Sequence, residues 1–302
     1  MEDSRVIALG FFDGVHIGHG ALLKRTRDAA DRLGLRAAAL SFDLHPDTLV
    51  YGCPVPLLNT MQEREQIIKD RWNIDEVIFV HFDRAMMEMP WESFVDDYLV
   101  AKLHAGHLVC GHDFRFGARG EGTAEKLKEK CRSRGIGCDV IPKVTLDNQL
   151  ISSTFIRQLL TAGDTLEAAR FLGHPHLISG TVVRGQGLGH TIGIPTANLI
   201  FEDGVLVPAY GVYAATVLVE GRVYPAVVNI GLHPTVGALE KPVVEACLLD
   251  FFGDLYGKRL EVSLFHRLRP EQCFPSVPAL QAQIEQDKQT TRRLFQRKEV
   301  TL

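Results

Sequence analysis

The sequence lacks several features that define other classes of protein. No apolar run reaches the roughly 18 to 20 residues that a membrane-spanning helix needs, so we expect neither a transmembrane segment nor a signal peptide. There is also no surplus of basic residues, because 33 Lys and Arg stand against 37 Asp and Glu. Neutralising a nucleic-acid backbone requires such a surplus, and we therefore expect no nucleic-acid partner.

Paired cysteines are missing as well. The six cysteines are scattered and none forms a CxxC pair, which argues against a disulfide scaffold or a zinc site. This pattern favours reduced thiols and predicts a cytoplasmic protein. With 46% hydrophobic and 23% charged residues, the composition is that of a soluble globular protein, and 302 residues favour two domains.

The first half of the chain alternates short apolar runs with amphipathic stretches. This order is typical of β-α units that form a parallel sheet covered by helices. The expected strands are Val6–Phe12, Ala37–Phe42, Glu76–Phe82, His107–Gly111 and Cys138–Ile141. The first expected helix begins near Gly18 and ends at Gly34, and the others are Met61–Trp72, Trp91–Leu103, Thr123–Arg134 and Ser153–Leu172. We predict an α/β domain over residues 1–173.

The second half changes character after Gly173. Gly and Pro become frequent, and helical periodicity disappears until the last segment, which indicates antiparallel β structure with many turns. Arg259–Leu268 alternates apolar and polar residues as a half-buried strand does. Ser276–Phe295 has the pattern of a closing helix. We predict a small antiparallel β-barrel with one closing helix over residues 174–302.

A first candidate site follows the first expected strand. His16 and His19 lie on either side of Gly18, where a tight turn opens the first helix. The N-terminus of a helix attracts anions through its unpaired N–H groups and its partial positive charge, so this turn suits a polyphosphate. The alternative is an ordinary turn in which the histidines only cap or pack.

Two later segments carry residues suited to the same ligand. Ser152, Ser153 and Thr154 place three hydroxyls at a helix start, with Arg157 one turn later, so that they can converge on phosphate oxygens; plain N-capping is the alternative. Gly111–Gly117 crowds Asp113 and an arginine between aromatic residues, a composition that suits a planar ring.

These segments, in this order, resemble the N-terminal adenylyltransferase module of the bacterial bifunctional riboflavin kinase/FAD synthetases, a Rossmann-like member of the HxGH nucleotidyltransferase superfamily. The resemblance implies that the phosphate of FMN attacks the α-phosphorus of ATP and that pyrophosphate leaves, with Mg²⁺ bridging the phosphates. It implies catalytic roles for His16 and His19. It also implies an ATP and phosphate site made by Phe12, Gly18, Asp113, Ser152, Thr154 and Arg157.

A second candidate site lies in the second half. Glycines alternate before Pro195, but no βαβ unit and no GxxxxGK[ST] sequence accompanies them, so both Rossmann and Walker interpretations fail there. A flap over phosphates fits that context. Thr196 and Asn198 stand two apart, on one side of an extended chain, and offer the oxygen ligands that Mg²⁺ prefers; a β-turn with an Asn cap is the alternative. Glu245 interrupts an apolar strand and is either a general base or an outward-facing residue.

Together these segments resemble the riboflavin kinase domain. The resemblance implies that Thr196 and Asn198 bind Mg²⁺ and ATP, that Gly187 and Gly189 belong to a flap, and that Arg269 holds the flavin. It implies that Glu245 takes the proton from the ribityl hydroxyl as it attacks the γ-phosphate. Two departures from the family pattern are His190 in the flap and Val236 in the flavin loop.

The overall expectation is a Mg²⁺-dependent bifunctional transferase that makes FMN from riboflavin and ATP, and then FAD from FMN and ATP. An adenylyltransferase with a weak or silent kinase half is one alternative. A non-catalytic flavin- or nucleotide-binding regulator is the other. The expected partners are therefore the small molecules riboflavin, FMN and ATP, and the sequence leaves the oligomeric state open.

Overall fold

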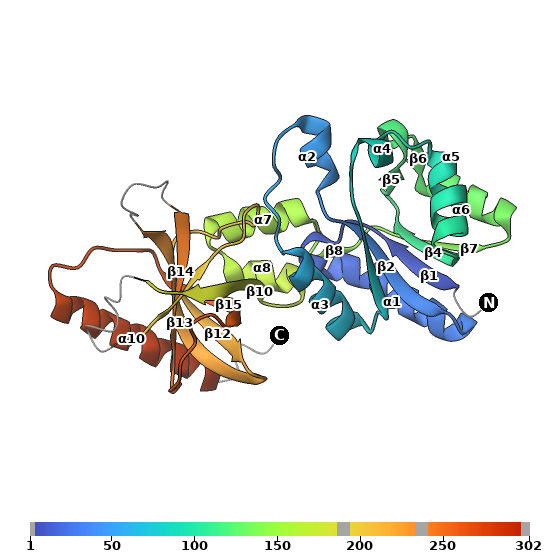
Figure 1. The fold of residues 1–302 in the computed structure, drawn as a ribbon. Coiled ribbons are helices and arrows are strands. Elements are labelled where there is room, and N and C mark those ends of the chain that lie inside the picture. Colours follow the sequence, from blue (N-terminus) through green and yellow to red (C-terminus); the bar gives the residue numbers. More distant parts are fainter. Residues whose placement is uncertain (1–3, 186–193, 234–240, 297–302) are drawn as a thin grey trace. The chain divides into compact units, whose positions relative to one another are not determined.

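The computed structural model describes residues 4–185, 194–233 and 241–296 (Figure 1). The chain divides into two compact units, Met1–Ser153 and Thr154–Leu302, and each is described by itself. Among the described residues, no helix is long and apolar enough to cross a membrane. The functional boundary expected between residues 173 and 174 stays a prediction.

The first unit is built on a five-stranded parallel sheet, as predicted. Its strand order is β3-β2-β1-β4-β7, and its strands are β1 (Arg5–Leu9), β2 (Arg36–Phe42), β3 (Glu76–Val80), β4 (Ala105–Gly111) and β7 (Gly137–Ile141). Two short hairpins complete the strands of this unit: β5 (Arg115–Phe116) with β6 (Gly122–Thr123), and β8 (Thr145–Leu146) with β9 (Gln149–Leu150).

Helices connect these strands and cover both faces of the sheet (Figure 1). They are α1 (Ile17–Leu33), α2 (Pro46–Tyr51), α3 (Met61–Trp72), α4 (Arg84–Met87), α5 (Trp91–Ser93), a π-helix (Phe94–Lys102) and α6 (Ala124–Arg134). The predicted stop of α1 at Gly34 is confirmed, since this glycine has a φ of 66° that other residues rarely adopt. The expected helix Trp91–Leu103 is instead a short α-helix that continues as the π-helix.

The order of the strands determines where a ligand can bind. The chain runs outward from β1 through β2 to β3, and then returns to place β4 on the other side of β1. At such a reversal, the loops after the two neighbouring strands diverge and leave a crevice at the carboxyl edge of the sheet. The turn after β1 and the loop after β4 flank this crevice.

The second unit is a closed antiparallel barrel of six strands, again as predicted. The strands, in the order in which they pair, are β10 (His176–Val183), β11 (Ala197–Ile200), β14 (Lys241–Leu248), β13 (Arg222–His233), β12 (Gly211–Val219) and β15 (Arg259–Arg269). Its core is dominated by alternating Val, Leu, Ile and Ala side chains, with Tyr213 fully buried among them. The closing helix is α10 (Val277–Gln296).

The expected single helix Ser153–Leu172 is two helices, α7 (Ser153–Ala162) and α8 (Thr165–Leu172). Gly163, with a φ of 87°, ends the first, and Asp164 caps the second by accepting a hydrogen bond from the N–H of Glu167. The Thr165 hydroxyl donates to the carbonyl oxygen of Phe265 at 3.1 Å, so α8 is tied to the barrel.

A buried histidine makes the stability of the barrel sensitive to acid. Burial, together with His174, lowers the pKa of His176 to about 3, whereas an unfolded chain titrates near 6.5. The unfolded state therefore binds the proton first, and stability falls as the pH drops below about 6.5. We expect a loss of about 2 kcal/mol between pH 7.5 and pH 5 from this group.

His176→Leu should reduce this acid sensitivity. Urea unfolding at the two pH values measures it, with exposed His112→Gln as the control that keeps the wild-type dependence. An unchanged pH dependence in His176→Leu would show that His176 is not responsible.

Candidate functional sites

The turn after β1 brings the two predicted histidines together. His16 is the N-cap of α1, where its Nδ1 accepts a hydrogen bond from the backbone N–H of His19 at 3.1 Å. The two rings stack with centroids 3.6 Å apart and planes 10° apart. Because Nδ1 of His16 accepts this hydrogen bond, the proton of a neutral His16 ring is on Nε2.

The surroundings of His19 favour its neutral form. Burial lowers the pKa of His19 well below its usual range, and the nearby His16 and Arg64 lower it further. Phe12, which is fully buried, meets the His19 ring edge-on with centroids 5.2 Å apart. At pH 7 the His19 ring is therefore neutral.

Gly18 gives the His16 ring room. A Cβ at this position would lie 3.1 Å from Nδ1 of His16, so the ring would have to shift by a few tenths of an ångström. Ser152 is half-buried and directly precedes α7, whereas Ser153 donates through Oγ to the carbonyl oxygen of Asp13 at 2.9 Å. Asp113 follows β4 at the same edge of the sheet as the histidine turn, and its side chain is 82% exposed.

Two predicted phosphate ligands belong to the other unit. Thr154 and Arg157 lie on α7 and are three residues apart, so they share a face of that helix. Their placement against His16 and His19 stays a prediction.

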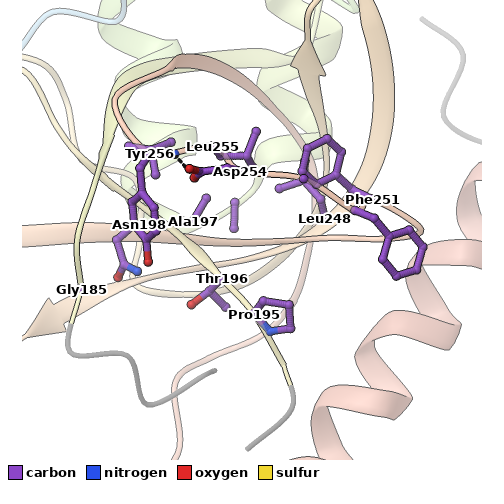
Figure 2. Close-up of a pocket in the computed structure, with 14 residues that line it drawn as sticks. Gly185, Pro195, Thr196, Ala197, Asn198, Leu248, Phe251, Asp254, Leu255 and Tyr256 are labelled. Carbon is purple, nitrogen blue, oxygen red and sulfur yellow. Dashed lines mark hydrogen bonds between the residues drawn. The ribbon is translucent and has the colours of Figure 1, made fainter. Parts of the chain in front are cut away.

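The barrel carries a cavity of about 470 Å³ beside the second predicted site. Thr196 and Asn198 line it together, and Figure 2 shows their side chains on one wall. Gly185 lies against Asn198, since a Cβ there would be 2.5 Å from Nδ2. A further part of the lining comes from Phe251–Tyr256, where the N–H of Tyr256 donates to Asp254 at 2.9 Å. The sequence interpretation missed this segment.

Glu245 does not line the cavity but is paired with a residue that does. In the barrel register Glu245 of β14 is opposite Asn198 of β11 on one side and Asn229 of β13 on the other. Its sequence neighbours Val244 and Ala246 point into the core, so Glu245 faces outward and is half-buried. A carboxylate flanked by two amides is therefore held on the outer wall, next to the Thr196–Asn198 pair.

Arg269 has a structural partner in this unit. Its guanidinium binds the buried carboxylate of Asp287 on α10, with Nη2 and Oδ2 2.9 Å apart. Its flavin role stays a prediction. Gly187, Gly189, His190 and Val236 lie outside the described residues. Across the part of the chain that the structure describes, no cluster of three or more His, Cys, Asp or Glu side chains could hold a metal ion. Thr196 and Asn198 offer oxygen donors, so Mg²⁺ there would depend mainly on phosphate and water.

Comparison with known proteins assigns each unit separately. A family model described as FAD synthetase matches residues 1–155, and one described as riboflavin kinase matches residues 172–295. The chain belongs to the bifunctional riboflavin kinase/FMN adenylyltransferase family. A family member from Listeria monocytogenes is 36% identical, covering 97% of this chain and 93% of the relative. Another, from Escherichia coli strain K12, is 37% identical, covering 97% and 94%.

A solved structure has the same architecture. A crystal structure described as a macrolide-efflux protein from Streptococcus pneumoniae aligns with a TM-score of 0.84 and 31% identity. The alignment covers 96% of this chain and 94% of the chain in the solved structure. The family fold therefore extends over both units.

The neutral state of His19 can be tested directly. We expect His19 to stay neutral at pH 6.5, where a free imidazole is half protonated, because burial and two neighbouring groups oppose its charge. Histidine ring NMR signals, assigned with His19→Gln and followed from pH 8 to pH 5, give its titration midpoint. A midpoint at or above 6.5 would contradict the described environment.

Proposed function

We propose that this chain phosphorylates riboflavin to FMN in its barrel unit and transfers an adenylyl group from ATP to FMN in its α/β unit, making FAD. The proposal is supported by two separate sets of polar side chains, one in each unit, that suit phosphate chemistry. One set is the stacked His16–His19 pair at the N-terminus of α1. The other is the Thr196–Asn198 pair beside Glu245.

In the adenylyl transfer, a phosphate oxygen of FMN forms a bond to the α-phosphorus of ATP, and the bond to the pyrophosphate oxygen breaks. Pyrophosphate leaves with the electron pair. His16 and His19 stabilise the transferring group, where negative charge builds up on the non-bridging oxygens. The first N–H groups of α1 face the same oxygens. Phe12 and Gly18 shape the pocket, while Asp113, Ser152, Thr154 and Arg157 bind ATP and its departing phosphates.

In the kinase reaction, the ribityl 5′-hydroxyl of riboflavin attacks the γ-phosphorus of ATP, and ADP leaves. Glu245 accepts the hydroxyl proton. Asn198 and Asn229 flank it in the strand register, and the Nδ2 of Asn229 donates to Glu271 at 3.3 Å. Gly187 and Gly189 form a flap over the phosphates, and Arg269 holds the flavin side. Thr196 and Asn198 would hold Mg²⁺ together with phosphate oxygens, and the metal would supply neutralisation of charge on the transferring group.

Two further assignments belong to this proposal. The functional domains are residues 1–173 and 174–302, and the protein acts in the cytoplasm on small molecules. The deciding experiment incubates the purified chain with riboflavin, ATP and Mg²⁺ and resolves the flavins by chromatography. FMN followed by FAD supports the proposal. FAD from supplied FMN alone indicates a silent kinase half, and tight flavin binding without turnover indicates a regulator.

Single substitutions should separate the two activities. His19→Ala should lower FAD formation by about 100-fold or more, the usual effect of removing one transition-state group, and leave FMN formation intact. Glu245→Ala should do the reverse, because it removes the proton acceptor. Rates from supplied FMN and from riboflavin measure the two steps. Loss of both activities in either folded variant would contradict two separate sites.

Replacing Gly185 tests the role of the Asn198 amide without changing Asn198 itself. Gly185→Ala places a Cβ 2.5 Å from the present position of Nδ2, so Asn198 must move. We expect a higher KM for ATP in FMN formation and an unchanged rate of FAD formation. Gly204→Ala controls for general destabilisation of this unit, because its φ of 83° strains an alanine although no atom lies within 4 Å of the new Cβ. Equal effects of the two variants would argue against a role for the amide.

A further inference from the structure

The histidine turn involves two buried charged residues that the sequence motifs did not single out, one in the turn and one that contacts it. Asp13, in the turn itself, is 2% exposed, and Arg64, in the first turn of α3, is 0% exposed. Burial lowers the pKa of Arg64 to about 10, and Asp13 opposes that shift, so the guanidinium stays a cation at pH 7. Charged side chains are rarely buried unless they are paired or hydrogen-bonded.

Asp13 attaches the turn to the start of α3. Its Oδ1 accepts hydrogen bonds from the backbone N–H groups of Leu58 at 2.8 Å and Asn59 at 3.4 Å. These residues directly precede Thr60, the N-cap of α3. The carboxylate therefore fixes the entry of α3 against the turn after β1.

Arg64 makes the reciprocal attachment from α3. Its Nη1 donates to the carbonyl oxygens of Phe11 and Phe42, each at 3.0 Å, and to Oγ of Ser41 at 2.8 Å. Ser41 in turn donates to the carbonyl oxygen of Phe11 at 2.7 Å. The guanidinium carbon also lies 4.2 Å from the centroid of the Phe11 ring. One side chain thus holds the carboxyl ends of β1 and β2 together.

The backbone on both sides of Asp13 is strained. Phe12 has a φ of 57° and Val15 a φ of 41°, a region that β-branched residues in particular avoid. Such a conformation persists only where contacts on several sides impose it. His16 follows Val15 immediately, so any relaxation of this turn moves the N-cap and the ring stack.

We propose that Asp13 and Arg64 form a two-way lock between the histidine turn and α3, and that Arg64 is a positioning residue for adenylyl transfer. The inference rests on the proposed adenylyltransferase function. Arg64 acts through the strained turn, which it holds in the shape that stacks His16 on His19. It does so by binding backbone oxygens rather than the substrate.

The test replaces Arg64 with methionine and with lysine. Arg64→Met should lower kcat for FAD formation by about 100-fold, because a displacement of about 1 Å in reacting groups has that effect. The KM values for ATP and FMN should change far less. Arg64→Lys should recover part of the rate, since an ammonium also has three donors for the oxygens that Nη1 binds, but it lacks the planar guanidinium that lies over the Phe11 ring. FMN formation should be unchanged in both.

Arg27 provides the matched control in the same unit. It is half-buried and donates to the carbonyl oxygen of Asn73 at 3.2 Å and to Asp75 at 3.0 Å. Arg27→Met should lower the melting temperature but keep the kcat of FAD formation. The NMR signals of the His16 and His19 rings provide a second readout. They should shift in Arg64→Met, because the stack is lost, and stay in place in Arg27→Met.

Arg64→Met that keeps its kcat and its ring signals would overturn the proposal. So would an equal loss of kcat in Arg27→Met, which would make the effect one of general stability. If Arg64→Met does not fold, Arg64→Lys decides, with a lowered kcat and shifted ring signals expected in a folded protein. If the wild type makes no FAD, the proposed function fails, and the ring signals alone then test the lock.

Discussion

The His16–His19 stack depends on a backbone turn that an unsupported chain would avoid. Positive φ values at Phe12 and Val15 carry a strain of about 1 to 3 kcal/mol each, and contacts made by other segments must offset it. Asp13 supplies one such contact to the segment before α3, Arg64 supplies another to the carbonyl oxygen of Phe11, and the Ser153 hydroxyl supplies a third. The parallel sheet then places the turn beside the crevice between β1 and β4. The sheet order, the turn and the contacts of Asp13 and Arg64 together place the stacked His16 and His19 rings at a helix N-terminus.

In the barrel, the register of the strands brings the candidate site residues together. Antiparallel pairing places Asn198, Glu245 and Asn229 in one row across three strands, although they are far apart in sequence. Alternation sends their neighbours into the core, so the polar row lies outside it. The two units therefore offer different groups for phosphate chemistry, one a helix N-terminus with stacked histidine rings, the other a carboxylate, amides and a hydroxyl. This difference is why single substitutions are expected to separate the two reactions.

Local signals in the sequence were sufficient for much of this architecture. The apolar runs predicted all five parallel strands, and Gly34 and Thr60 mark helix ends by their own chemistry. The break between α7 and α8 was missed although Gly163 and Asp164 carry stop and cap signals, because the apolar pattern continues across it. Arg64 was not predictable, since in sequence it is one charge on an amphipathic helix. Only the approach of β1 and β2 makes it a buried donor. The outward direction of Glu245 likewise requires the strand register.

The most direct test of two separate phosphorus-transfer sites follows the label from ATP into the flavin. Riboflavin and Mg²⁺ are incubated with ATP labelled at either the γ- or the α-phosphorus, and FMN and FAD are separated. The account predicts γ-label in both flavins and α-label in FAD alone, with the α-label lost when His16 and His19 are both replaced by alanine. α-Label that never enters a flavin, or that enters at the wild-type rate in the doubly substituted protein, would contradict it.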